Sequence, residues 1–248
     1  MNTLIEETID LDILNGLSFE ECYTNYPLPQ IFTLHREYTP TLSLSHASKH
    51  GHLSTAKLLV SKGADVTADD DLALRWASEN GHLETVKYLI TQGANVNNTV
   101  LCYASKTGQL RIIKYLVSQG AVITQASDDH AICCAMRYIV TRGHLETLKY
   151  LVSQGADVIN DEFLVGMASG GGHLEIVKYL VSQGGDITAD DNYALHQASA
   201  NGHLELVKYL ISQGADINTV GSYVLHQASA NGHLELVKYL VSQGANVA

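Results

Sequence analysis

The feature that most constrains this chain is an internal repeat of about 30 residues. The segment LHQASANGHLELVKYLISQGADI at 195–217 returns nearly unchanged as LHQASANGHLELVKYLVSQGANV at 225–247. Glycines at equivalent positions mark the copies: Gly51, Gly81, Gly108, Gly143, Gly172, Gly202 and Gly232. Successive markers lie 27 to 35 residues apart, so residues 41–248 are predicted to hold seven units of a repeat architecture.

Each unit is predicted to form two short helices joined by a tight turn. In the second half of the sixth unit, Leu206, Val207 and Leu210 recur at three- and four-residue steps, a pattern typical of a helix with one buried face. Gly214 follows directly, where a glycine commonly ends a helix. Helices this short are marginal alone, so their stability must come from the stacking of neighbouring units in a solenoid.

The order of an LH pair, an AS pair, NGHLE, VKYL and SQGAD resembles the ankyrin repeat over residues 41–248. That resemblance implies an all-α solenoid of helix-turn-helix units whose concave face binds proteins. This chain has Tyr193, Ala194, Leu195 and His196 where the family has TPLH, and three residues are missing before them. We therefore expect short hairpin or loop fingers. The short form is also similar to the ankyrin sets of giant DNA viruses that infect amoebae.

Two regions are expected along the chain. Seven units are predicted at about 41–70, 71–98, 99–125, 126–159, 160–189, 190–219 and 220–248. Residues 1–40 do not repeat, and their seven acidic and one basic side chains give a charge of 1 − 7 = −6. This segment is interpreted as a divergent N-terminal cap. The alternative is an adaptor segment that recruits a second protein, for example degradation machinery, while the repeats select the client.

Variation among the copies suggests where a partner would bind. The two residues before each turn glycine differ among the first four units, whereas they are identical in the last two. Together with two aromatic residues, they form the predicted partner-binding set: Lys49, His50, Trp76, Glu79, Asn80, Tyr103, Lys106, Thr107, Thr141 and Arg142. Tryptophan, tyrosine and arginine are favoured at binding hot spots. Surface drift would give the same diversity, and both aromatic residues could simply fill space between first helices.

Composition argues against nucleic-acid and membrane partners. The chain carries 15 basic and 26 acidic side chains, a formal charge of −11, whereas phosphate binding requires a basic surface. No window holds the roughly 20 consecutive apolar residues of a membrane span, and the N-terminus lacks a signal-peptide pattern. We expect an intracellular and cytoplasmic protein, in the host cytoplasm if viral. The four cysteines are too sparse for a disulfide framework and are expected to be reduced.

Nothing in the sequence predicts an enzyme, a cofactor or a metal site. GxGxxG, GxxxxGK[ST], HExxH and GxSxG are all absent. Histidines follow six turn glycines, but copies about 10 Å apart cannot share one zinc ion, so these rings are expected to bond backbone of adjacent turns. Acidic runs such as Asp69, Asp70 and Asp71 are expected at helix N-termini as capping residues.

The seventh unit keeps the internal pattern and lacks the polar face of a capping repeat. We therefore expect either fraying of this unit or self-association through it.

Overall fold

The computed structural model describes residues 40–123, 130–218 and 223–246, which form seven helix pairs and no strand. The first helices of the pairs are α4 (Pro40–Lys49), α6 (Ala68–Glu79), α8 (Asn98–Lys106), α10 (His130–Arg142), α12 (Phe163–Gly170), α14 (Ala189–Ala200) and α16 (Tyr223–Ala230). The second helices are α5 (Leu53–Ser61), α7 (Leu83–Thr91), α9 (Leu110–Ser118), α11 (Leu145–Ser153), α13 (Leu174–Ser182), α15 (Leu204–Ser212) and α17 (Leu234–Ser242).

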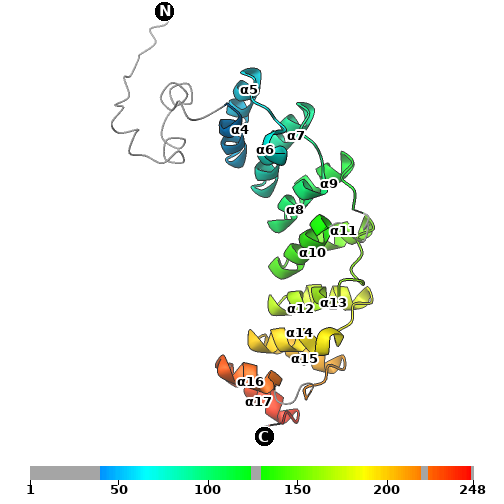
Figure 1. Cartoon of the computed structure of the whole chain (residues 1–248). Coiled ribbons are helices and arrows are strands. Elements are labelled where there is room, and N and C mark those ends of the chain that lie inside the picture. The colour runs from blue at the N-terminus through cyan, green and yellow to red at the C-terminus, as the bar shows by residue number, and fades with distance from the viewer. Residues whose placement is uncertain (1–39, 124–129, 219–222, 247–248) are drawn as a thin grey trace, which may run out of the picture.

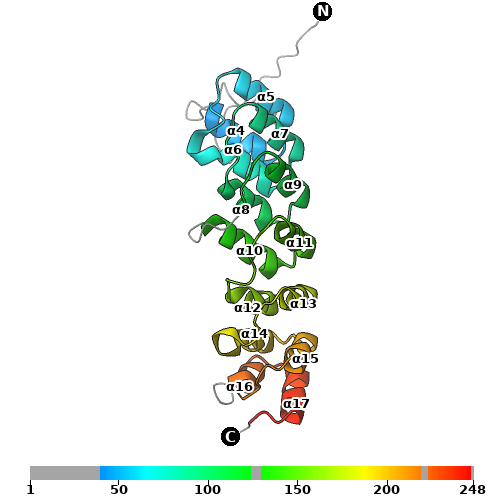
Figure 2. The same ribbon diagram turned by 90° about the vertical axis from the view of Figure 1, so that its right-hand side faces the viewer.

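The pairs stack in chain order into a curved solenoid (Figure 1). First helices line the concave side, and second helices form the outer row (Figure 1). Figure 2 shows the two rows side by side along the stack. The predicted all-α solenoid is confirmed. The sequence limits proposed for the seven units stay predictions, and α6 begins at Ala68, before the expected limit of its unit.

The core is the continuous seam between the two rows. In α15, Leu206, Val207 and Leu210 are buried, whereas Glu205 is exposed and pairs with Lys208 at 2.7 Å. Small residues of the first helices, such as Ala198, are fully buried and allow close helix approach. The amphipathic pattern therefore sets which face of each second helix enters the seam.

Four of the six histidines after the turn glycines bond the backbone of the preceding unit, as the sequence predicted. The Nε2 atom of His82 lies 2.9 Å from the carbonyl oxygen of Lys49, and that of His203 lies 3.0 Å from the carbonyl oxygen of Gly170. His173 and His233 make the same contact. Because a carbonyl only accepts, each ring must carry its proton on Nε2.

Successive fingers are loops joined by side-chain acceptors, each of which reaches from the finger before a unit to the finger after it. The backbone N–H of Asn95 donates to Asp71 Oδ1 at 2.8 Å, and the N–H of Asp216 donates to Asn192 Oδ1 at 3.2 Å. Both acceptor residues are buried. Each bond gives a backbone N–H of the finger an acceptor within the protein.

The acidic run lies in the first turn of α6, as expected, but it does not supply the N-terminal cap residue. That cap residue is Thr67, which makes no side-chain capping bond. Asp69, Asp70 and Asp71 instead take left-handed dihedrals, with φ of 52°, 55° and 60°. Asp and Asn tolerate this conformation better than most residues, because their short polar side chains bond locally. The run therefore forms a left-handed turn that brings Asp71 to the next finger.

The N-terminal segment, predicted as a cap or adaptor, lies almost wholly outside the described residues.

Candidate functional site

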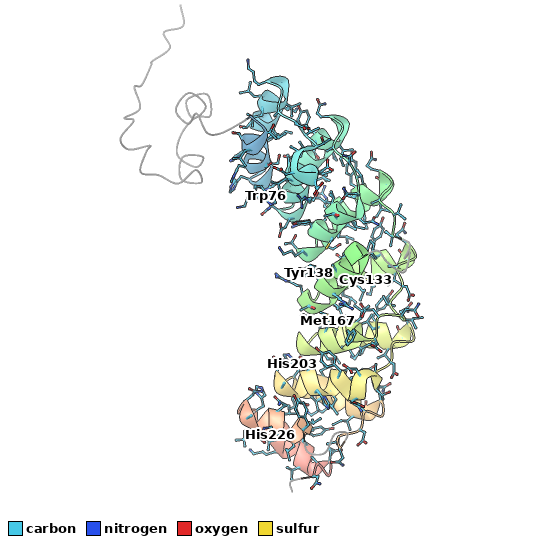
Figure 3. The ribbon with its side chains drawn as sticks, viewed as in Figure 1. Trp76, Cys133, Tyr138, Met167, His203 and His226 are labelled. Carbon is cyan, nitrogen blue, oxygen red and sulfur yellow. The ribbon has the colours of Figure 1, made fainter. Side chains whose placement is uncertain are left out.

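One position in the first helices gathers large side chains along the concave side. It lies five residues before each turn glycine and holds His46, Trp76, Tyr103, Tyr138 and Met167 in the first five units. The last two units have Gln197 and Gln227 there. Figure 3 shows Trp76, Tyr138 and Met167 following one another along the first helices on the concave side. An aromatic and apolar stripe thus runs from α4 to α12. It ends before the last two units, which both have glutamine at this position.

Trp76 is half-buried between the first two units. Its ring meets the His46 ring edge-on, with 5.3 Å between centroids, and the Lys49 Nζ atom lies 5.5 Å from the indole centroid. A lysine over a tryptophan face is a favourable cation–π arrangement. Trp76 therefore fills space between first helices, which was one of the two expectations from the sequence. Part of its surface still faces the concave side.

Tyr103 continues the stripe beside a bonded charge pair. The Arg75 guanidinium lies 5.3 Å from the Tyr103 ring centroid. Lys106 Nζ donates to Glu79 Oε1 at 2.6 Å, and this hydrogen bond raises the pKa of Lys106, although partial burial opposes it. The lysine side chain is 37% exposed, so its charge is held in place at the surface of α8.

Two adjoining cavities flank Tyr138 of α10. The larger, about 350 Å³, is lined by Cys134, Arg137, Tyr138, Thr141, Arg142 and Met167. The smaller, about 180 Å³, is lined by Cys102, Tyr103, Lys106, Cys134 and Tyr138. They share Cys134 and Tyr138, so they form one surface, which we call the α8–α12 groove. Tyr138 is 40% exposed and stands between the two halves.

The groove exists because α10 differs from its neighbours. At 13 residues it is the longest described helix, which agrees with the insertion expected from the 35-residue spacing before Gly143. Its Arg137 Nε donates to Asp161 Oδ2 at 2.9 Å, and this bond raises the pKa of Arg137. The same guanidinium lies 5.6 Å from the Phe163 ring centroid. Arg137 thereby fixes α10 against the start of α12.

The structure divides the predicted partner-binding residues into two groups. Tyr103, Lys106, Thr141 and Arg142 line the α8–α12 groove, whereas Lys49, His50 and Trp76 lie at the α4–α6 end. The other predicted residues serve local structure. The Asn80 amide donates to the Trp76 carbonyl at 2.9 Å, Thr107 donates to the Glu79 carbonyl at 2.5 Å, and the Glu79 carboxylate holds Lys106.

Sequence reasoning missed Tyr138, Arg137, Met167 and Cys134. Tyr138 and Met167 could have been found by counting five residues back from Gly143 and Gly172, because that register already held Trp76 and Tyr103. Cys134 lies nine residues before Gly143, a position that holds Phe163, Tyr193 and Tyr223 in other units, so no shared residue type marked it.

The described residues contain no group of three histidine, cysteine or acidic side chains able to hold a metal ion. Burial, together with the nearby Cys134 thiol, raises the pKa of Cys102 to about 11, although Lys106 opposes this shift. A thiol with so high a pKa is a poor nucleophile at neutral pH. The groove therefore offers rings, apolar surface and cationic donors.

A family model described as "Ankyrin repeats (3 copies)" matches residues 33–99, 74–162 and 164–248. The chain belongs to the ankyrin-repeat family. The crystal structure of the human ASB11 ankyrin repeat domain superposes with a TM-score of 0.68 at 22% identity, covering 83% of this chain and 99% of that one. That likeness shows a shared ankyrin fold. No curated protein matches the chain in sequence. The similarity to viral ankyrin sets stays a prediction.

Proposed function

We propose that this ankyrin-repeat protein is a non-catalytic interaction module that binds a protein partner on its concave face, chiefly through α6 to α12. Ankyrin repeats generally mediate protein–protein interaction. The observation that carries the proposal is the α8–α12 groove, where half-exposed rings and cationic side chains gather at the irregular helix α10. Such rings and arginines are the residue types enriched at binding hot spots.

The groove is built on helices whose side chains are already held in place. Arg137 is held by Asp161, Lys106 by Glu79, and the Thr141 hydroxyl donates to the Arg137 carbonyl at 2.7 Å. Ordering of loose side chains is one of the main costs of association. A partner that binds the groove would therefore lose less side-chain entropy, because these side chains are already ordered within the fold.

The proposed partner is a protein in the aqueous phase. Within the parts of the chain that the structure describes, every helix is too short or too polar to cross a membrane. The net charge of −11 disfavours a nucleic-acid partner. Both points support a protein ligand over the other two classes.

Affinity capture from a cell lysate tests the proposal with the full chain as bait. The test variant is Tyr138→Ala combined with Arg142→Ala, and both side chains are exposed, so neither change opens the core. The matched control is Lys149→Ala, which removes a positive charge from α11 on the outer row. We expect a captured protein to be lost with the groove variant and kept with the control. Equal capture of that protein by both variants would contradict the proposal that this face binds it.

A further inference from the structure

The charged residues that line the α8–α12 groove are all basic, in a chain that is acidic overall. Three of its lining residues are basic, namely Lys106, Arg137 and Arg142, and none is acidic. The chain as a whole has 26 acidic and 15 basic side chains. A uniform distribution would have placed more acidic than basic groups in the groove. This local reversal of charge points to the chemistry of the ligand.

The basic side chains keep donors available to a ligand. Glu79 engages one of the three donors of Lys106, and Asp161 engages two of the five donors of Arg137. Arg142 is exposed and has no ion-pair partner among the described residues. Arginine donors match carboxylate oxygens in bidentate geometry. The groove therefore presents cationic donors from both α8 and α10.

The rest of the lining is apolar or aromatic. Tyr138 separates the two halves, Met167 borders the larger, and Tyr103 borders the smaller. Tyrosine rings and a flexible methionine suit a bulky apolar side chain, because the thioether adapts to irregular shapes. The larger half, at about 350 Å³, is of the size of a small ligand pocket and can take such a side chain.

We infer that the α8–α12 groove binds an extended acidic peptide segment of another protein. The segment inserts a bulky apolar side chain against Tyr138 and Met167 and sets carboxylates beside Lys106 and Arg142. This inference rests on the proposed concave-face function and adds the chemical class of the partner. The carboxylates supply charge complementarity, and the apolar side chain fixes the register of the segment.

Fluorescence anisotropy of the full chain with three labelled peptides tests the inference. The first peptide is rich in Asp and Glu around one Phe and one Leu. The second replaces each acid with its amide, and the third replaces Phe and Leu with Ala. We expect the first to bind and each of the others to bind at least about fivefold more weakly, the loss of one hot-spot contact. Affinity of the first should also fall with added salt.

Groove variants locate the binding. Arg142→Ala and Tyr138→Ala should each weaken the first peptide about fivefold or more, whereas Lys149→Ala on the outer row should leave it unchanged. Equal binding of the acidic and amide peptides would overturn the inference, as would equal losses with Arg142→Ala and Lys149→Ala. An oligonucleotide that bound as tightly as the first peptide would also overturn the inference, because the groove would then recognise negative charge alone and not a peptide.

Two further outcomes separate this inference from the proposed function. If a captured protein depends on Tyr138 and Arg142 but the acidic peptide does not displace it, the concave-face function stands and the acidic class is wrong. If photo-crosslinking from the position of Tyr138 reaches residues 1–39 of the same chain and no peptide binds, the groove is filled by the chain itself. That result would overturn an external acidic partner.

Discussion

The turn glycine of one unit and the histidine of the next share the same small space. Gly202 has a φ of 76°, and a Cβ atom there would lie 2.5 Å from His233 Nδ1. Gly232 has nearly the same φ, 77°, but a Cβ atom there would meet nothing within 4 Å. The turn therefore needs glycine for its dihedral angle, and at Gly202 also for the approach of the histidine.

Gly202→Ala should lower the free energy of unfolding by about 1–2 kcal/mol through the left-handed dihedral. It should cost about 1 kcal/mol more through the loss of the bond from His233 Nε2 to the Ala200 carbonyl. Urea denaturation in a double-mutant cycle with His233→Ala measures the second part. We expect Gly202→Ala to lower the free energy of unfolding less when residue 233 is alanine. An equal loss in both backgrounds would contradict a steric clash between the added Cβ atom and His233. Gly232→Ala reports the dihedral cost alone.

Cys102 should be nearly inert to alkylation in the folded chain. Its pKa of about 11 leaves about one thiol in a thousand ionised at pH 8, and the thiolate is the nucleophile. Peptide mapping after iodoacetamide treatment should show modification about a hundredfold slower in the folded chain than in urea. Equal rates in the two states would show that the thiol is neither buried nor perturbed.

At the scale of the element, the left-handed turns within the first residues of α6 and α14 join neighbouring fingers. Asp71 and Asn192 occupy the same place in their turns, with φ of 60° and 63°, and each accepts a backbone N–H of the next finger. The sixth unit thus shows that an amide performs the role that a carboxylate performs in the second. The necessary features are tolerance of a left-handed dihedral and a short side-chain oxygen.

Asp71→Ala should lower the free energy of unfolding by about 0.5–1.5 kcal/mol, because it removes the acceptor of the Asn95 N–H, which lies in an exposed finger. Asp71→Asn should stay within about 0.5 kcal/mol of the parent chain, as Asn192 indicates. Hydrogen exchange at the Asn95 amide gives a local readout. It should be faster in the alanine variant and unchanged in the asparagine variant, and slow exchange in both would contradict the link.

At the scale of the whole molecule, histidines distributed along the stack make stability depend on pH. Burial lowers the pKa of His52 and His144, with further lowering by His50 and His82 at the first and by Arg142 and His173 at the second. Burial also lowers the pKa of His196, although Asp191 and Asp190 oppose it. Nε2 of His144 has no hydrogen-bond partner among the described residues.

The folded chain should lose stability as the pH falls below about 6.5, the value for an unperturbed histidine. Since the folded pKa is lowered, the unfolded chain binds protons first, and stability is full above 6.5 and declines as the pH falls toward the folded value. Urea midpoints at pH 7.5, 6.5 and 5.5 measure the decline. His144→Gln should reduce it, since Gln109 already occupies the equivalent position in the third unit. A constant midpoint would contradict the prediction.

The last helix pair leaves apolar side chains uncovered. Leu234 is 61% exposed and Val241 is 46% exposed, whereas Leu204, the equivalent of Leu234 in α15, is partly buried and packs against the core. We expect the chain to self-associate through α17, and sedimentation velocity at rising concentration should show it. Leu234→Glu with Val241→Glu should abolish it. A strictly monomeric chain with fully protected α17 amides would contradict both self-association and fraying.

The sequence predicted the helix pairs, the buried face of each second helix, the turn glycines and the histidine bonds, because these repeat at a fixed register and depend on local contacts with one neighbouring unit. It also placed Tyr103, Lys106, Thr141 and Arg142 in a binding set. It did not predict the groove, because that surface depends on how the longer α10 stands between α8 and α12.

By itself, then, the sequence determined the solenoid, since a repeated amphipathic pattern has one way to bury every unit against the next. The tertiary structure decided three further features: the left-handed turn that carries Asp71 to Asn95, the pairing of Arg137 with Asp161, and the exposure of Tyr138. The Arg137–Asp161 pair joins two units, the exposure of Tyr138 depends on how the units pack, and the Asp71–Asn95 bond joins the two fingers that flank one unit. The amphipathic pattern does not specify these contacts, because they follow from the spacing and tilt of neighbouring helices.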